Sequence, residues 1–357
     1  MSEPDPGRGA PQQSTQVTLS RGFIAWLERA RCGIAFTSYQ TGQLFFVGLT
    51  PDRKTSLHQT QYVRAMGIHA IGERLLLASD TAIWRLENVL QTGQVAQGMF
   101  DRMYVPRAAS FTGDLDVHEL SVRRDGQVVF VNTRYSCLAT LSATHSFRPI
   151  WKPAFISRLV PEDRCHLNGL AMEGGEPRYV TAVSRSDSVG GWRDRRWEGG
   201  MIIDVTTDEI VVDDLSMPHS PRLHDGALWV LDSGRGSLVR IDRATKKKDD
   251  IAFCPGFLRG LAFVGRFALV TTSLPREGLF NNLPLQKNLE ARDAEPRCAV
   301  YVIDTQTRGI VEWIDLVGYI TELFDITTLP NCLCPASVAP SGADANSLVT
   351  IEGELPS

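Results

Sequence analysis

The chain of 357 residues carries a net charge of −4 at pH 7, and 43% of its residues are hydrophobic. No stripe of Lys and Arg interleaves with aromatic residues, so the sequence lacks the electrostatic signature of nucleic-acid binding. No segment reaches the roughly 20 apolar residues of a membrane-spanning helix. We therefore expect neither nucleic acid nor a membrane as a partner.

We expect one domain at residues 17–330 between two disordered segments, residues 1–16 and 331–357. The first segment is rich in Pro, Gly, Ser and Gln, and the last is rich in Ser, Ala, Pro and Gly. Cys332 and Cys334 have no partners at metal-site spacing. The seven cysteines are odd in number and mostly lie in apolar segments, so we expect free thiols and a soluble, cytoplasmic protein.

Polar clusters precede five strand-like segments at intervals of about 40 to 50 residues. The clusters occupy residues 64–67, 116–119, 166–169, 218–221 and 258–260. Each interval holds about four strands of 5 to 6 residues with their turns. Repeats of this period indicate sheets that are arranged around an axis, as in a β-propeller.

Two-residue turns follow several of these segments. Asp125-Gly126 and Asp225-Gly226 fit hairpin turns because Asp and Gly tolerate positive φ, and Gly174-Gly175 takes the same place in the intervening copy. Each copy therefore predicts a hairpin that forms the inner pair of strands of one blade. Residues 236–241 and 299–303 predict outer strands.

The two ends of the chain supply a sixth blade. Strand-like residues 34–39 and 43–47 lie near the start, and residues 322–327 lie near the finish. Pairing N- and C-terminal strands would close the ring and hide its edges. We predict an all-β, six-bladed β-propeller; seven blades, a β-sandwich or two separate β domains are the alternatives.

Two insertions interrupt the repeats. Residues 184–197 alternate Arg, Asp and Trp, which would either roof a channel or pair charges across a surface. Residues 274–298 separate two strands by far more than the usual spacing of about 2 to 5 residues, and residues 284–292 have helical composition. We expect a lid or binding loop there, with Arg276 and Glu277 near its base.

Residues at the start of the inner strands of a propeller converge at one mouth of the central channel, a concave place that favours ligand binding. Three histidines lie at such positions, and histidine transfers protons near neutral pH. His118, His166 and His219 are therefore the predicted catalytic residues. The predicted ligand-binding residues are the polar groups near them: Arg64, Glu119, Asn132, Asn168, Ser220 and Arg259.

These residues support more than one chemistry. Arg64 and Arg259 would hold a carboxylate or phosphate through bidentate hydrogen bonds. The three histidines would alternatively hold a divalent metal with an open coordination position. A structural interpretation also stands, in which the polar side chains only satisfy backbone groups in a wet channel. The sequence itself identifies no cofactor.

Residues 166–172 read His-Leu-Asn-Gly-Leu-Ala-Met and resemble the Asn-Gly-Leu-Ala repeat of gluconolactonase, regucalcin and strictosidine-synthase-like six-bladed propellers. The resemblance implies a calcium-centred pocket that hydrolyses lactones or phosphoesters, with Asn168 at the matching ligand position. The chain departs from that pattern, because His118, His219 and Arg259 stand where calcium would need oxygen ligands.

A longer resemblance, over residues 33–329, is to a bacterial family of conserved hypothetical proteins with a propeller-like domain of unknown function. It implies no particular reaction. The matching stretches are residues 37–42, 64–67, 113–118, 130–133, 162–169, 217–222 and 254–262.

We predict that the channel mouth binds a small polar, anionic molecule. One interpretation is an enzyme, either a hydrolase, a lyase or an isomerase, that uses histidine as acid or base. The alternative is a non-catalytic scaffold for protein partners, because the fold alone does not decide function. A second alternative is a metal-dependent enzyme with His118, His166 and His219 as ligands.

Overall fold

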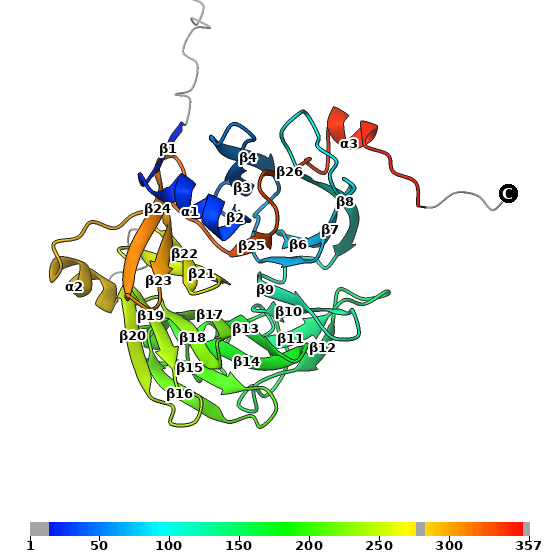
Figure 1. Ribbon diagram of the computed structural model, residues 1–357. Helices are drawn as coiled ribbons and strands as arrows, with labels where there is room; N and C mark the ends of the chain where they lie inside the picture. Colours follow the sequence, from blue (N-terminus) through cyan, green and yellow to red (C-terminus); the bar gives the residue numbers. More distant parts are fainter. Residues whose placement is uncertain (1–13, 276–282, 353–357) are drawn as a thin grey trace, which may run out of the picture.

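The computed structural model describes residues 14–275 and 283–352. Within these residues, six β-sheets surround a common axis, and their innermost strands contact one another in turn around it (Figure 1). The predicted six-bladed β-propeller is therefore confirmed. The innermost strands are β5 (Ile68–Ile71), β9 (Val117–Val122), β13 (Leu167–Glu173), β17 (Pro218–His224), β21 (Phe257–Val264) and β25 (Ile326–Pro330).

One blade joins both ends of the chain. It consists of β25 and three N-terminal strands, β2 (Cys32–Ser38), β3 (Gln43–Leu49) and β4 (Thr55–Gln61). Strand β25 pairs antiparallel with β2, from Ile326 opposite Phe36 to Pro330 opposite Cys32. The predicted closure of the ring by N- and C-terminal strands is confirmed.

The other five blades follow in chain order, each built outward from its inner strand. The next two contain β6 (Arg74–Ala78), β7 (Ala82–Asn88) and β8 (Arg102–Phe111), and then β10 (Val128–Asn132), β11 (Cys137–Thr140) and β12 (Arg148–Trp151). After them come β14 (Glu176–Ala182), β15 (Gly200–Asp204) and β16 (Ile210–Leu215), and then β18 (Ala227–Asp232), β19 (Ser237–Ile241) and β20 (Lys248–Phe253). The last blade contains β22 (Phe267–Ser273), β23 (Ala299–Asp304) and β24 (Gly309–Gly318), with β1 (Thr15–Leu19) added at its outer edge.

All three predicted turns link inner to second strands, but the one at Asp125-Gly126 is longer than two residues, because Val122 pairs with Val128 across it and the N–H of Gly126 donates to the carbonyl oxygen of Arg123. Asp225 and Gly226 have φ of 47° and 73°, and Gly174 and Gly175 have φ of 59° and 81°. Both turns therefore have two residues in the left-handed region, which suits the twist of a tight hairpin.

Apolar side chains fill the space between adjacent blades. Val129 and Val131 of β10, for example, pack in one buried cluster with Leu167 of β13 and Val180 of β14. Such interlocking of neighbouring sheets holds the mouth of the channel on a rigid frame.

The short helices lie at the periphery. Helix α1 (Phe23–Ala30) buries Phe23, Trp26 and Leu27 against the blades that hold β3 and β24. Helix α2 (Pro284–Glu290) confirms the helical composition of residues 284–292, whereas Arg276 and Glu277 lie outside the described residues. The remaining two are η1 (Gly191–Arg195) and α3 (Ala343–Ser347).

The C-terminal boundary of the folded body lies later than residue 330. Strand β26 (Pro335–Ser337) pairs parallel with β8, inside the segment that we expected to be a disordered tail. The carboxylate of Asp101 accepts hydrogen bonds from the backbone N–H of Leu333 at 2.7 Å and of Cys334 at 2.8 Å. The small and apolar residues of this segment fill the edge of the β8 blade, a role that composition alone does not reveal.

The N-terminal boundary differs slightly from the prediction, because strand β1 begins at Thr15. No helix among the described residues has the length and hydropathy needed to cross a bilayer.

Candidate functional site

A β-bulge recurs at one place in four inner strands. From Val117 to Leu120, strand β9 advances three residues while its partner β10 advances two, from Asn132 to Phe130. In β13, β17 and β21 the inner strand likewise has one more residue than its partner strand at the bulge. A bulge bends its strand and re-aims nearby side chains, so it provides a common reference for the blades.

The residues that begin the bulge are equivalent in the four strands, and they are His118, Asn168, Ser220 and Arg259, as the sequence alignment predicts. His219 is the paired residue just before the bulge of β17, and His166 lies two residues before Asn168. The three histidines therefore occupy different positions of the repeat.

His166 shares a backbone conformation with residues of three other blades. All four adopt the left-handed backbone region, with φ between 49° and 54°: Arg64, Asp116, His166 and Met217. Such strained backbone is sparse for residues other than glycine and concentrates at functional sites. Asp116, His166 and Met217 stand immediately before β9, β13 and β17, and Arg64 lies a few residues before β5.

Two layers of residues surround the channel. We call the first, whose members line the cavities described below, the mouth ring: Met66, His118, Asn168, His219, Arg259 and Phe324. We call the next the channel ring: Gly67, Glu119, Gly169, Ser220, Gly260 and Asp325. Glycine alternates with larger residues in the channel ring, because the inner strands approach closely there. A Cβ at Gly67 would lie 2.7 Å from the carbonyl oxygen of His118, and one at Gly260 would lie 2.7 Å from Cα of Asp325.

A cavity of about 280 Å³ opens at the mouth ring. His118, His166, Arg64 and Arg259 line it together with Trp192 of η1. Insertion 184–197 thus forms part of the wall of the cavity, which agrees with the first of its two predicted roles.

His118 is neutral, with Nδ1 as a hydrogen-bond donor and Nε2 as an acceptor. Its Nδ1 lies 2.9 Å from the carbonyl oxygen of Asp116 and 2.8 Å from Oγ1 of Thr133. Because a carbonyl can only accept, Nδ1 carries the proton and Nε2 keeps its lone pair. Burial lowers the pKa of His118 to about 4, although Asp116 acts in the opposite direction.

His219 has the same tautomer. Its Nδ1 lies 2.8 Å from the carbonyl oxygen of Met217 and 3.0 Å from Oγ of Ser233. Arg259 donates from Nη1 to the free Nε2 of His219 at 3.2 Å. Burial, and next the charge of Arg259, lower the pKa of His219 well below its usual range.

Arg259 lies among aromatic rings. Its guanidinium carbon is 4.8 Å from the ring centre of Phe257, 5.5 Å from that of Phe324 and 5.7 Å from that of Tyr39. Among the described residues, no carboxylate is within ion-pair distance of it, and Glu322 and Asp116 act on it only as more distant charges. Burial lowers the pKa of Arg259 to about 10, so it remains a cation at neutral pH.

His166 is paired with a carboxylate. Its Nδ1 lies 2.9 Å from Oδ2 of Asp163, and Trp192 donates from Nε1 to the same oxygen at 2.8 Å. The Trp192 ring also stacks on His166, with centroids 4.2 Å apart. Burial alone would raise the pKa of Asp163, but the charge and hydrogen bond of His166 lower it overall. The ionised carboxylate therefore holds the proton of His166 on Nδ1 and leaves Nε2 as the reactive nitrogen.

Arg64 lines the cavity, but its charge is already partly matched. Its Nη2 lies 3.0 Å from Oδ1 of Asp116, and its side chain is 39% exposed. Burial alone would raise the pKa of Asp116, whereas His118, His166 and Arg64 lower it overall. Arg64 is thus a weaker candidate for anion binding than Arg259.

Glu119 and Ser220 lie deeper, in the channel ring. Glu119 accepts hydrogen bonds from Oγ of Ser220 at 2.6 Å, from Nη1 of Arg222 at 2.9 Å and from the backbone N–H of Leu170. Ser220 Oγ also lies 2.9 Å from the carbonyl oxygen of Arg259. These contacts join four blades across the channel, and they occupy both oxygens of Glu119.

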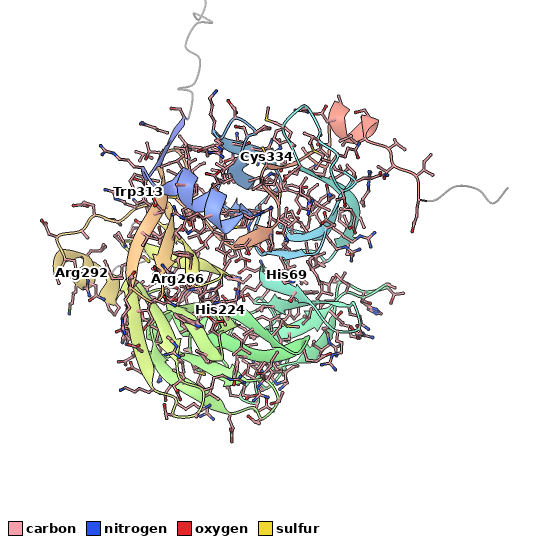
Figure 2. All side chains as sticks on the ribbon, viewed as in Figure 1. His69, His224, Arg266, Arg292, Trp313 and Cys334 are labelled. Carbon is pink, nitrogen blue, oxygen red and sulfur yellow. The ribbon has the colours of Figure 1, made fainter. Side chains whose placement is uncertain are left out.

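The opposite mouth of the channel has a separate cavity of about 310 Å³, which Glu119 also lines. His69 and His224 belong to this second mouth and are labelled near the middle of the ring in Figure 2. Burial lowers the pKa of His69 to about 4, with a further contribution from Arg222. Glu119, Arg222 and Asp325 therefore lie between the two mouths.

Asn132 is buried at the end of β10 and is not among the residues that line these cavities. Its Oδ1 accepts a hydrogen bond from the backbone N–H of Tyr135 at 3.1 Å. The structure thus brings eight of the nine predicted residues to the mouth or the channel below it, and leaves Asn132 in the blade.

The residues of the site that were not among the predicted ones include Tyr39, Asp163, Trp192 and Phe324. Asp163 and Trp192 lie within segments that the sequence had singled out, and the position of Asp163 three residues before His166 was an available signal. Tyr39 and Phe324 come from opposite ends of the chain, so only the closed ring places them together.

The metal alternative does not fit the geometry. Arg259 directs an N–H at Nε2 of His219, the nitrogen that a metal would need, because Nδ1 of His219 already donates to a carbonyl. Within the described residues, no group of three or more His, Cys, Asp or Glu side chains is arranged to hold a metal ion. The histidines are therefore better described as hydrogen-bonding groups.

Known structures resemble the chain in fold. A chain in the crystal structure of a nidogen/laminin complex has a TM-score of 0.54 at 12% sequence identity, covering 84% of this chain and 99% of that one. A protein of unknown function from Bacteroides caccae gives a TM-score of 0.47 at 10% identity, covering 84% and 98%. At such identities, the first likeness shows the fold alone.

The chain has no match among curated proteins. The profile of a family described as "Domain of unknown function (DUF4915)" matches residues 21–338, which include all six blades. This result confirms the resemblance to a family of unknown function, and its end at residue 338 agrees with the place of strand β26. The chain belongs to the DUF4915 family.

Proposed function

We propose that the cavity at the mouth ring binds a small organic anion through Arg259, and that His166 transfers a proton to or from it. The proposed activity is that of an enzyme acting by acid–base catalysis, within the classes of hydrolases, lyases and isomerases. A cavity of about 280 Å³ suits a small molecule.

The arrangement of Arg259 is the observation that carries the proposal. Its guanidinium is fixed by aromatic rings and by His219, yet no described carboxylate forms an ion pair with it. A buried charge without a counter-ion is costly, and a bound anion would supply the missing charge. Hydrogen bonds between an anion and a guanidinium are among the stronger ones in proteins.

His166 is the histidine best suited to proton transfer. His118 and His219 have pKa values far below neutrality because of burial, so they act as neutral acceptors. His166 instead has an ionised carboxylate, Asp163, on Nδ1, which orients the ring and leaves Nε2 as the nitrogen that exchanges a proton with the ligand. In this arrangement Asp163 orients His166, as a third group orients the general base in many active sites.

Binding is tested with the full-length protein and a panel of acetate, benzoate, inorganic phosphate and sulfate. We expect at least one of them to raise the melting temperature of the wild type, because a ligand that binds only the folded state stabilises it. Arg259→Met should abolish this rise. Arg266→Met is the matched control, because Arg266 also lies over an aromatic ring, that of Phe267, in the same sheet but away from the mouth.

Two outcomes would contradict the anion site. In one, no anion of the panel stabilises the wild type, which would favour the scaffold alternative. In the other, Arg259→Met and Arg266→Met respond to the anions to the same extent.

Catalysis is tested separately with His166→Gln, which removes proton transfer but keeps a polar side chain of similar size. A panel of carboxylate-bearing esters, lactones and hydroxy acids is incubated with both proteins and analysed by mass spectrometry. We expect conversion by the wild type, a loss of roughly 10²-fold or more in the variant, and unchanged anion binding. Equal conversion by the two proteins would exclude His166 as the proton carrier.

A further inference from the structure

We infer that a one-oxygen subsite below the cavity selects carboxylates, with Asn168 and Arg259 as its donors. This inference rests on the proposed anion site and adds the chemical class of the ligand. A second, smaller cavity of about 10 Å³ lies under the first, and Asn168, Arg259, His118 and Glu119 are among the residues that line it. Its volume is that of about one water-sized group.

Asn168 brings an unused donor to this smaller cavity, which we call the chamber. Its side chain is 1% exposed, and its Oδ1 accepts a hydrogen bond from Oγ1 of Thr181 at 2.6 Å. Its Nδ2 has no hydrogen-bond partner in the structure. Buried amide groups are nearly always paired, so this amide lies where an acceptor atom is expected.

Arg259 brings a second unused donor. Its Nη1 donates to His219, whereas its buried Nε has no hydrogen-bond partner. The Nε–H and Nη2–H groups of a guanidinium point in the same direction and form the edge that binds a carboxylate with two parallel hydrogen bonds. Because Nη1 is on the other side, its bond to His219 leaves this edge available.

No acceptor of the chamber wall reaches either donor in the structure. Both oxygens of Glu119 are already bound, to Leu170, Ser220 and Arg222, and both oxygens of Asp325 accept backbone N–H groups. His118, whose Nε2 keeps a lone pair, also lines the chamber. The chamber therefore offers donors to one oxygen atom, while the second oxygen of a carboxylate would remain in the larger cavity above. A planar carboxylate with two oxygens fits this division, whereas a phosphate group has a third terminal oxygen to place.

The body of the carboxylate would lie between two apolar surfaces of the larger cavity. Trp192, stacked on His166, forms one of them, and Phe324 beside Arg259 forms the other. The predicted ligand is a small monocarboxylate whose carboxyl end enters first, with its reacting carbon near His166.

The experiment titrates acetate and benzoate, and their primary amides acetamide and benzamide, into the full-length protein. An amide has the shape of the acid but lacks its charge and one acceptor oxygen. We expect the two carboxylates to bind the wild type and the two amides to bind at least about 10-fold more weakly. Inorganic phosphate should also bind more weakly than the better of the two carboxylates.

The decisive variant is Asn168→Asp, which replaces the donor with an acceptor of the same shape. Asn132→Asp is the matched control, because Asn132 is also a buried Asn whose Nδ2 lacks a partner, but it does not line the chamber. Carboxylate binding should fall at least about 10-fold in Asn168→Asp and stay within about 2-fold in Asn132→Asp. Asn168→Ala, checked for folding by circular dichroism, should also weaken binding.

Equal carboxylate affinity in Asn168→Asp, Asn168→Ala and Asn132→Asp would overturn the subsite while leaving the anion site in place. Equal binding of acids and amides by the wild type would overturn the carboxylate class, and so would tighter binding of phosphate. If Arg259→Met bound the same panel as well as the wild type does, the proposed function would fail along with this inference.

Discussion

Arg259 and His219 face each other across 3.2 Å, with a guanidinium N–H directed at the lone pair of a neutral imidazole. The two residues come from neighbouring blades and lie at the bulges of β17 and β21. The contact fixes the tautomer of His219, excludes a proton or a metal from its Nε2, and orients the cation in the mouth. The roles of the other mouth residues follow from this geometry.

The orientation of Arg259 should depend on an acceptor at position 219. His219→Gln keeps an oxygen that can accept from Nη1, whereas His219→Ala removes it. We expect benzoate affinity to fall roughly 10-fold in the alanine variant, because an unpaired buried donor costs about 1 to 3 kcal/mol. The glutamine variant should stay within about 3-fold of the wild type. Calorimetric titration measures the benzoate affinity of both variants. Equal affinities would count against the orienting role of His219.

Acid should destabilise the protein through His118. The pKa of this residue falls from about 6.5 in the unfolded chain to about 4 in the fold because of burial. As the pH decreases from 6.5 toward 4, the unfolded state gains a proton that the folded state does not, so the free energy of unfolding decreases. The loss from this one group should be about 2 kcal/mol between pH 6.5 and 4.5.

The measurement compares urea unfolding of the wild type and His118→Gln at several pH values. Asp325 acts with the opposite sign, because burial and then Glu119 raise its pKa to about 7 and the folded state keeps its proton. Both proteins contain Asp325, so the difference between their free energies of unfolding at each pH removes its contribution. Parallel pH profiles of the two proteins would show that His118 does not remain neutral in the fold.

The close approach of the inner strands predicts a sharp contrast between two glycines. In Gly260→Ala, the added Cβ would meet Cα of Asp325 at 2.7 Å, and we expect a loss of about 1 to 3 kcal/mol in the free energy of unfolding. Gly309 at the start of β24 has nothing within 4 Å of such a Cβ, so Gly309→Ala should change stability by less than about 0.5 kcal/mol. Denaturant unfolding tests the contrast, and comparable losses would argue against close packing around the channel.

The segment that contains β26 should be part of the stable fold. Removing residues 332–357 would delete the buried Cys334 and Ala336 and leave Asp101 without its backbone donors. We expect this truncation to cost about 3 kcal/mol or more. Removing only residues 339–357 keeps β26 and should cost much less. Thermal unfolding of both proteins decides between this description and a dispensable tail.

The sequence alone was sufficient for the ring and for most of the mouth. Turn residues such as Asp225-Gly226 have local conformational requirements, and the period of the polar clusters reflects the size of a blade, so both could be identified without a structure. The pairing of β25 with β2 followed from the need to close the ring.

Other features depend on three-dimensional register. The bulges, which show that His118, His166 and His219 occupy different positions of the repeat, become visible only when strands are paired. Phe324 and Tyr39 look like core residues in sequence, and they reach Arg259 only because the two ends of the chain meet. The segment with β26 has a composition typical of disorder, yet its burial depends on the outer face of β8.

The most direct measurement is a crystal structure of the wild-type protein grown with acetate or benzoate. One carboxylate oxygen should lie about 2.7 to 2.9 Å from a nitrogen of Arg259, within the cavity walled by His166 and Trp192. A carboxylate found only at the opposite mouth beside Arg222, or only on the outer surface of the blades, would contradict an anion site at the mouth ring.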